Sequence, residues 1–164
     1  MLYLILLLGI AVYYDVRYFR IPNVLIVIGM LTGMVYRVVN KTFLCTELFL
    51  GMLIPVLVLF LLFYLHMLGA GDIKLLSMTG IFLGTSILGV IWKSFIIAAV
   101  LSFFQLVIQK KFRNRILYFI GYCLNVLKTG KAEPYYQAEQ DQFKHAMHFS
   151  VAIFGAVILY YFGI

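Results

Sequence analysis

Two aspartates, Asp15 and Asp72, could carry out chemistry because of where they stand in a largely apolar chain. Asp15 follows the first apolar run, and Asp72 stands in GAGDIKLL, residues 69–76, shortly after the apolar run 48–65. An ionisable group at membrane depth is costly unless it faces a bundle interior or a wet cavity. Their placement therefore indicates a functional site. Glu47, at the start of a span, is expected to be an ordinary solvated carboxylate.

Two carboxylates that converge could activate water directly. Close like charges resist simultaneous ionisation, so such a pair can share one proton. The ionised member draws a proton from water while the protonated member polarises a carbonyl group, which gives a tetrahedral intermediate without a covalent acyl-enzyme. This is aspartic-protease chemistry. The plainer alternative is that Asp72 only caps a helix and Asp15 only pairs with Arg17 or Arg20 at the membrane interface.

The composition predicts the elements that position these aspartates. Of the 164 residues, 65% are hydrophobic and 12% are charged, far outside the range of soluble domains. A membrane-spanning helix needs roughly 20 residues, so about six fit. We predict an all-α polytopic membrane protein that forms a single transmembrane domain over residues 1–164. The helices are expected in the apolar runs 2–14, 21–39, 48–65, 73–83, 87–108 and 146–163.

Individual runs carry further expectations. The run 2–14 has no basic segment before it and no cleavage pattern after it, so it is predicted to be a retained helix that continues through Asp15. The run 73–83 is short and rich in small polar residues, which favours a half-length or tilted helix held inside the bundle. Gly29 and Gly33 form a small-residue pair that permits close helix packing.

The basic residues predict the orientation. With the amino terminus outside, all but Arg37, Lys41 and Lys93 of the 13 basic residues fall on the cytoplasmic side. Because Asp15 follows one predicted span and Asp72 follows three, both are expected near the cytoplasmic face. The basic residues lie mainly between apolar runs, a pattern that favours membrane topology over nucleic-acid binding.

The segment 109–145 is the long connection of the chain and is expected to be a cytoplasmic loop. It contains the basic cluster KKFRNR, then the apolar patch ILYFIGYCLNVL, then a polar stretch. One interpretation is an interfacial helix with its basic residues near anionic headgroups. The other is a flexible loop with a few buried apolar contacts.

Two sequence blocks resemble the type IV prepilin leader peptidases, a family of GxGD aspartic proteases. They are DVRYFRIPN, residues 15–23, and GAGDIKLL. The resemblance implies that Asp15 and Asp72 are the catalytic aspartates. It also implies supporting residues: Gly69 and Gly71, which shape the active-site loop, and Lys74, Arg20, Pro22 and Asn23, which match the motif without an individual chemical role.

The resemblance also implies the activity. A membrane aspartic endopeptidase would cleave the basic leader from a prepilin or pilin-like precursor at the cytoplasmic face of the cell membrane, with the precursor and the lipid bilayer as partners. Larger members carry paired CxxC motifs that are associated with zinc and methyl transfer. This chain has none. We therefore expect no methyltransferase activity and no cofactor, as in the short peptidase-only branch of tight-adherence (Flp-type) systems.

Three alternatives compete with this interpretation. The chain could be a GxGD protease for another substrate, such as preflagellin, or a transporter or assembly subunit whose carboxylates bind a proton or an ion. A metal site is the third alternative. His66, His145 and His148 show no HExxH pattern and no well-spaced third ligand, so no metal is predicted.

Overall fold

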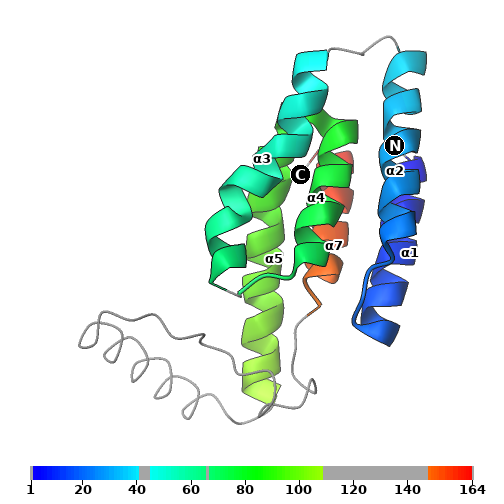
Figure 1. The fold of residues 1–164 in the computed structure, drawn as a ribbon. Helices are drawn as coiled ribbons and strands as arrows, with labels where there is room; N and C mark the ends of the chain where they lie inside the picture. The colour runs from blue at the N-terminus through cyan, green and yellow to red at the C-terminus, as the bar shows by residue number, and fades with distance from the viewer. Residues whose placement is uncertain (1, 41–44, 66, 109–147, 164) are drawn as a thin grey trace.

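The computed structural model describes residues 2–40, 45–65, 67–108 and 148–163, and these residues form a helical bundle (Figure 1). The described residues contain no strand, so the all-α prediction is confirmed, and each predicted apolar run contains one helix. The helices are α1 (Leu2–Tyr18), α2 (Asn23–Val39), α3 (Cys45–Tyr64), α4 (Ala70–Leu83), α5 (Ile87–Ile108) and α7 (Phe149–Tyr161), with a short 3-10 helix, η1 (Gly84–Ser86), between α4 and α5.

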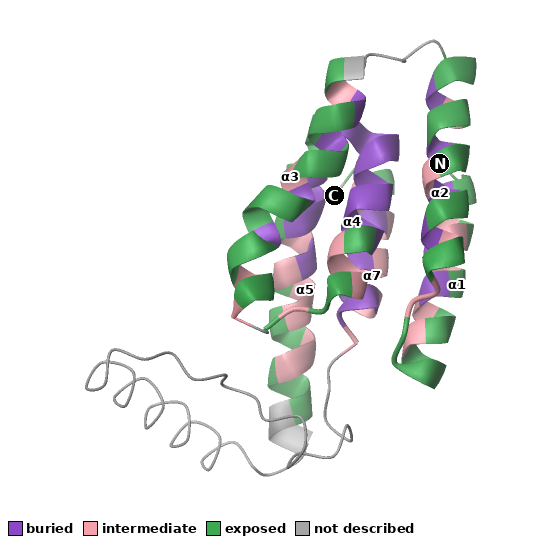
Figure 2. Cartoon of the chain, viewed as in Figure 1, coloured by how far each residue is buried: buried purple, intermediate pink, exposed green. Residues whose placement is uncertain are grey.

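Helix α4 is the centre of the bundle. Every residue from Leu75 to Leu83 is buried, and α4 contacts all the other described helices (Figure 2). Its 14 residues span roughly 21 Å, less than the roughly 30 Å of a bilayer core. The structure therefore agrees with the expectation of a short helix held inside the bundle.

The outer surfaces of α1, α2 and α3 are apolar and exposed, as Leu2, Val24 and Leu57 illustrate (Figure 2). Two stretches among the described residues are long and apolar enough to cross a membrane, Thr46–Tyr64 and Ala70–Gln105. The second reverses direction at η1, so that α4 and α5 run antiparallel (Figure 1). The count of about six spans stays a prediction, and the predicted loop 109–145 lies outside the described residues.

Helix boundaries near the aspartates follow local chemistry. Helix α1 continues to Tyr18, as expected. Helix α2 begins at Asn23 instead of residue 21, because a proline disfavours helical backbone at the residue before it, Ile21, and Pro22 itself is extended, with φ −62° and ψ 129°. Helix α4 begins at Ala70, three residues earlier than predicted, so Asp72 lies in its first turn.

Glycines allow α2 to approach α4 closely. A Cβ atom at Gly29 would overlap the Met78 side chain, and one at Gly33 would lie 2.9 Å from side-chain atoms of Ile81 and Phe82. The predicted packing role of this glycine pair is therefore confirmed. Both glycines are buried.

An ion pair joins α2 to α3 at the end of the bundle where α2 ends and α3 begins. The Arg37 Nη1 atom lies 3.1 Å from Glu47 Oε2, and Arg37 Nε donates to the Ile81 carbonyl oxygen at 2.7 Å. Arg37 is only 4% exposed. The expectation that Glu47 is an ordinary solvated carboxylate was thus incomplete, because sequence position alone did not show the buried guanidinium beside it.

Candidate active site

Asp15 lies in the last turn of α1, immediately before the chain leaves the helix. Its side chain is 15% exposed. Its backbone carbonyl accepts a hydrogen bond from the Phe19 N–H at 2.8 Å. Phe19 adopts a positive φ of 53°, which is uncommon for a bulky residue. This left-handed residue ends α1 and starts the turn toward Pro22.

Asp72 is the third residue of α4. Its backbone N–H donates to the Gly69 carbonyl at 3.1 Å, and its carboxylate hydrogen-bonds the Gly69 backbone. A side-chain acceptor at this position satisfies a backbone donor that the helix start leaves free. The alternative that Asp72 caps a helix is therefore correct only in part, because Asp72 lies inside the first turn of α4 and Gly69 is the capping residue.

One open cavity of about 360 Å³ contains both aspartates. It forms where α1 ends and α4 begins, which are at the same end of the bundle (Figure 1). The remaining lining residues are Phe19, Arg20, Ile21, Asn23, Gly69, Ala70, Gly71 and Lys74. The fold thus brings together both motif blocks.

The residues expected to support the aspartates differ in their placement. Lys74 Nζ donates to Asn23 Oδ1 at 3.0 Å, which connects α4 to α2 across the cavity. Arg20 lines the same cavity and is exposed. Pro22 does not line it and acts instead on the start of α2.

Gly69 matters for space and not for a special backbone conformation. Gly69 and Gly71 are expected to shape the active-site loop, and neither has a positive φ. A Cβ atom at Gly69 would lie 3.2 Å from Asp72 Oδ2, tighter than ordinary contact. At Gly71 the nearest atom, on Ile21, would lie at 3.6 Å. Gly69 therefore leaves room for the Asp72 carboxylate.

Two side chains from α7 contact Asp15. Ser150 Oγ donates to Asp15 Oδ2 at 2.5 Å, and His148 Nδ1 lies 3.3 Å from the same oxygen. The sequence interpretation considered His148 only as a metal ligand and did not single out Ser150. The span count predicts only that the last predicted helix starts at the same membrane face as the two aspartates. No spacing in the sequence pairs Ser150 or His148 with Asp15.

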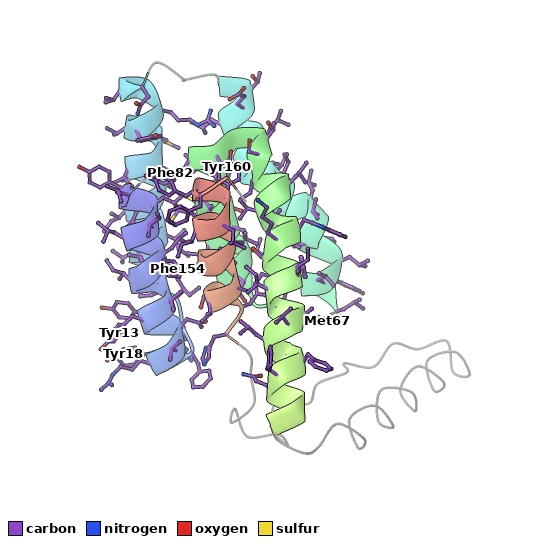
Figure 3. The ribbon with its side chains drawn as sticks, turned by 180° about the vertical axis from the view of Figure 1, so that it is seen from behind. Tyr13, Tyr18, Met67, Phe82, Phe154 and Tyr160 are labelled. Carbon is purple, nitrogen blue, oxygen red and sulfur yellow. The ribbon has the colours of Figure 1, made fainter. Side chains whose placement is uncertain are left out.

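A second cavity, of about 330 Å³, adjoins the first at Gly69 and Asp72. Its other lining residues are mostly apolar: Leu62, Met67, Leu68, Phe95, Ala98, Ser102 and Phe149. Figure 3 shows Met67 at this end of the bundle beside α5. Asp72 therefore lines both a cavity that contains the charged or polar side chains of Asp15, Arg20, Asn23 and Lys74, the polar cavity, and a second cavity whose lining is mostly apolar.

The described part of the chain has no group of three or more side chains that could hold a metal ion. His148, one of the three histidines weighed as ligands, contacts Asp15 and packs on the Phe19 ring. His66 and His145 lie outside the described residues. The arrangement supports acid–base chemistry by carboxylates.

Comparison with known proteins agrees with the two sequence blocks. The sequence model of the type IV leader peptidase family matches residues 2–108, a segment that contains both blocks and the cavity residues from α1, α2 and α4. No curated protein and no solved structure matches the chain. The family match covers well over half of the 164 residues. The chain therefore belongs to the type IV leader peptidase family.

Proposed function

We propose that the protein is a membrane aspartic endopeptidase that removes the leader from prepilin or pilin-like precursors, with Asp15 and Asp72 as the catalytic pair. Family membership supports a peptidase. The observation that carries the proposal is that the two aspartates, one from each motif, line one cavity. Two neighbouring carboxyl groups that share one proton are suited to activating water.

The reaction follows from a pair that shares one proton. The ionised carboxylate takes a proton from water as the water oxygen bonds to the scissile carbonyl carbon. The protonated carboxyl group donates its proton to the carbonyl oxygen. The tetrahedral intermediate then collapses and the C–N bond breaks. The leaving nitrogen takes the proton that the first carboxylate removed from water, and a hydroxyl group of the intermediate returns a proton to the second carboxylate. The products are a leader with a new carboxyl group and a mature chain with a new amino group.

The two adjoining cavities support a substrate with a polar–apolar junction. The polar cavity contains Arg20, Asn23 and Lys74, whereas the second cavity is largely apolar, and both include Asp72. A precursor whose polar leader meets an apolar helix would place its scissile bond at that boundary. We propose that the leader occupies the polar cavity and the apolar helix the other.

The location that we propose is the cytoplasmic face of the cell membrane. The distribution of basic residues supports this orientation. Near Asp15, Tyr13 and Tyr18 are 59% and 57% exposed, and Figure 3 shows them at the outer side of α1. Exposed tyrosines are typical of a membrane–water interface, where a polar leader would arrive.

Coexpression with a candidate precursor tests the substrate. The precursor should carry a basic leader, a glycine and an apolar helix, and mass spectrometry of the mature amino terminus should find cleavage after the leader and no added methyl group. A methylated product made by this chain alone would contradict the peptidase-only assignment. Cleavage of preflagellin but no prepilin would reassign the substrate. Solute flux that depends on both aspartates, with no cleavage, would favour a transporter.

A further inference from the structure

The amino-terminal end of α7 supplies a contact to the proposed catalytic site that no motif assigns. The family match ends at residue 108, whereas His148 and Ser150 stand at the start of α7. Both nevertheless contact Asp15 on α1, and 135 residues separate Ser150 from its partner. Helix α7, the last of the described helices, therefore contributes to the geometry around Asp15.

The hydrogen bond from Ser150 to Asp15 is short and shielded from solvent. Ser150 is 0% exposed, and its hydroxyl donates to Asp15 Oδ2 at 2.5 Å. A hydrogen bond from a hydroxyl to a carboxylate at this distance is in the range of the strong, charge-assisted class. Because the serine is buried and the distance short, this bond restricts the rotation of the Asp15 carboxylate.

Both α7 contacts end on the same carboxylate oxygen. His148 Nδ1 lies 3.3 Å from Asp15 Oδ2, so an imidazole with its proton on Nδ1 donates to the oxygen that Ser150 also binds. Neither of these two contacts involves the other oxygen, Oδ1. One oxygen is thus anchored, and the second remains available for water or for the proton shared with Asp72.

His148 is itself held in place from the α1 side. Its ring packs against Phe19, with ring centroids 4.8 Å apart and planes inclined by 38°. Phe19 is the residue with the positive φ of 53°, and its N–H donates to the Asp15 carbonyl. The end of α1 and the start of α7 are therefore connected twice, by the ring contact between Phe19 and His148 and by the contacts of α7 with the Asp15 carboxylate.

We propose that Ser150 and His148 are positioning residues that hold Asp15 in the orientation needed for catalysis. This inference rests on the proposed function, because it assumes that Asp15 activates water. It predicts that removing either donor lowers the rate of the chemical step and leaves substrate binding nearly unchanged, since neither residue lines the polar cavity.

Ser150→Ala is the first test, measured as kcat and KM for precursor cleavage by the purified full chain in detergent. Loss of one hydrogen bond to a charged group should lower kcat about 10- to 100-fold, with KM within about threefold. Ser150→Thr keeps the hydroxyl and should recover most of the rate. Ser94→Ala is the matched control, because Ser94 is also 0% exposed but donates only to Val90 in its own helix.

His148 allows the same comparison. His148→Leu removes the donor and should lower kcat by about tenfold. His148→Asn places an amide nitrogen near the position of Nδ1 and should restore part of the loss. Equal kcat losses in His148→Leu and His148→Asn, or in Ser150→Ala and Ser150→Thr, would overturn the positioning role in favour of a purely structural one.

An infrared measurement tests the contact without relying on proteolysis. The chain has three aspartates, Asp15, Asp72 and Asp141, so ¹³C-aspartate labelling followed by subtraction of the Asp15→Asn spectrum isolates the Asp15 band. Ser150→Ala should move this band to higher frequency, and Ser94→Ala should not. If the Asp15 band does not move in Ser150→Ala, the Ser150–Asp15 hydrogen bond does not form. If the band moves but kcat is unchanged, the hydrogen bond forms but does not position Asp15 for catalysis. A wild-type protein that cleaves no precursor contradicts the proposed function instead, which the infrared result alone would not do.

Discussion

Gly51 of α3 and Gly80 of α4 meet backbone to backbone, so closely that a Cβ atom on either would overlap the carbonyl oxygen of the other. Gly80 lies eight residues after Asp72, about two helical turns along α4. The contact therefore fixes the helix that carries Asp72 against α3. Small residues at such crossings are typical of helix packing in membranes.

Gly80→Ala and Gly51→Ala should each destabilise the protein. Because the clashing atoms belong to a neighbouring backbone, which cannot rotate away, we expect a loss of about 1–3 kcal/mol in the free energy of unfolding. Thermal unfolding in detergent measures this as a lower midpoint. Gly89→Ala is the control, because nothing lies within 4 Å of its Cβ position, and its midpoint should stay the same or rise. An unchanged midpoint for Gly80→Ala would show that α3 and α4 do not cross at this point.

The Arg37 guanidinium should stabilise the end of the bundle away from the aspartates. Arg37→Met keeps an apolar stem but removes the donors to Ile81 and Glu47, so we expect about 2 kcal/mol lower stability. Glu47→Gln should cost less than about 1 kcal/mol, because the Glu47 side chain is 45% exposed and the buried bond to Ile81 remains. Chemical or thermal unfolding compares the two variants. Equal losses would mean that the ion pair, and not the carbonyl contact, provides the stabilisation.

Gly69 should be more sensitive to a methyl group than Gly71. An alanine Cβ at residue 69 would lie 3.2 Å from Asp72 Oδ2 and would displace that carboxylate by a few tenths of an ångström. Since catalysis depends steeply on such geometry, Gly69→Ala should lower kcat by about tenfold. Gly71→Ala, at ordinary distance from Ile21, should lower it less. Cleavage assays on equal amounts of folded protein compare the two kcat losses. A larger loss in Gly71→Ala than in Gly69→Ala would contradict the role assigned to Gly69.

The helices were predictable because each is a continuous apolar run. Even the burial of α4 could be anticipated, because its run is short and carries small polar residues. The helix starts were less predictable. Pro22 delays α2, whereas α4 begins at Ala70 and so takes Asp72 into its first turn. These shifts in the helix starts depend on the capping residues themselves, and a hydropathy profile does not describe the conformation of single residues.

The two aspartates were predictable as a pair because each belongs to one of the two sequence blocks that resemble the family. The number of predicted spans before each aspartate also predicts that both lie near the same face of the membrane. The contacts of Ser150 and His148 were not, because they join residues far apart in sequence and have no spacing signal. The Arg37–Glu47 ion pair and the Gly51–Gly80 crossing were not predictable for the same reason. Side-chain partners across helices depend on rotation about each helix axis, which nearly uniform apolar sequences specify poorly.

The most direct test of the central claim is precursor cleavage by Asp15→Asn and Asp72→Asn, each purified and shown to be folded. Glu47→Gln, which removes a carboxylate far from the cavity, is the matched control. We predict that both aspartate variants lose cleavage by at least about a thousandfold while Glu47→Gln cleaves like the wild type. If either folded aspartate variant cleaves at the wild-type rate, Asp15 and Asp72 are not the catalytic pair.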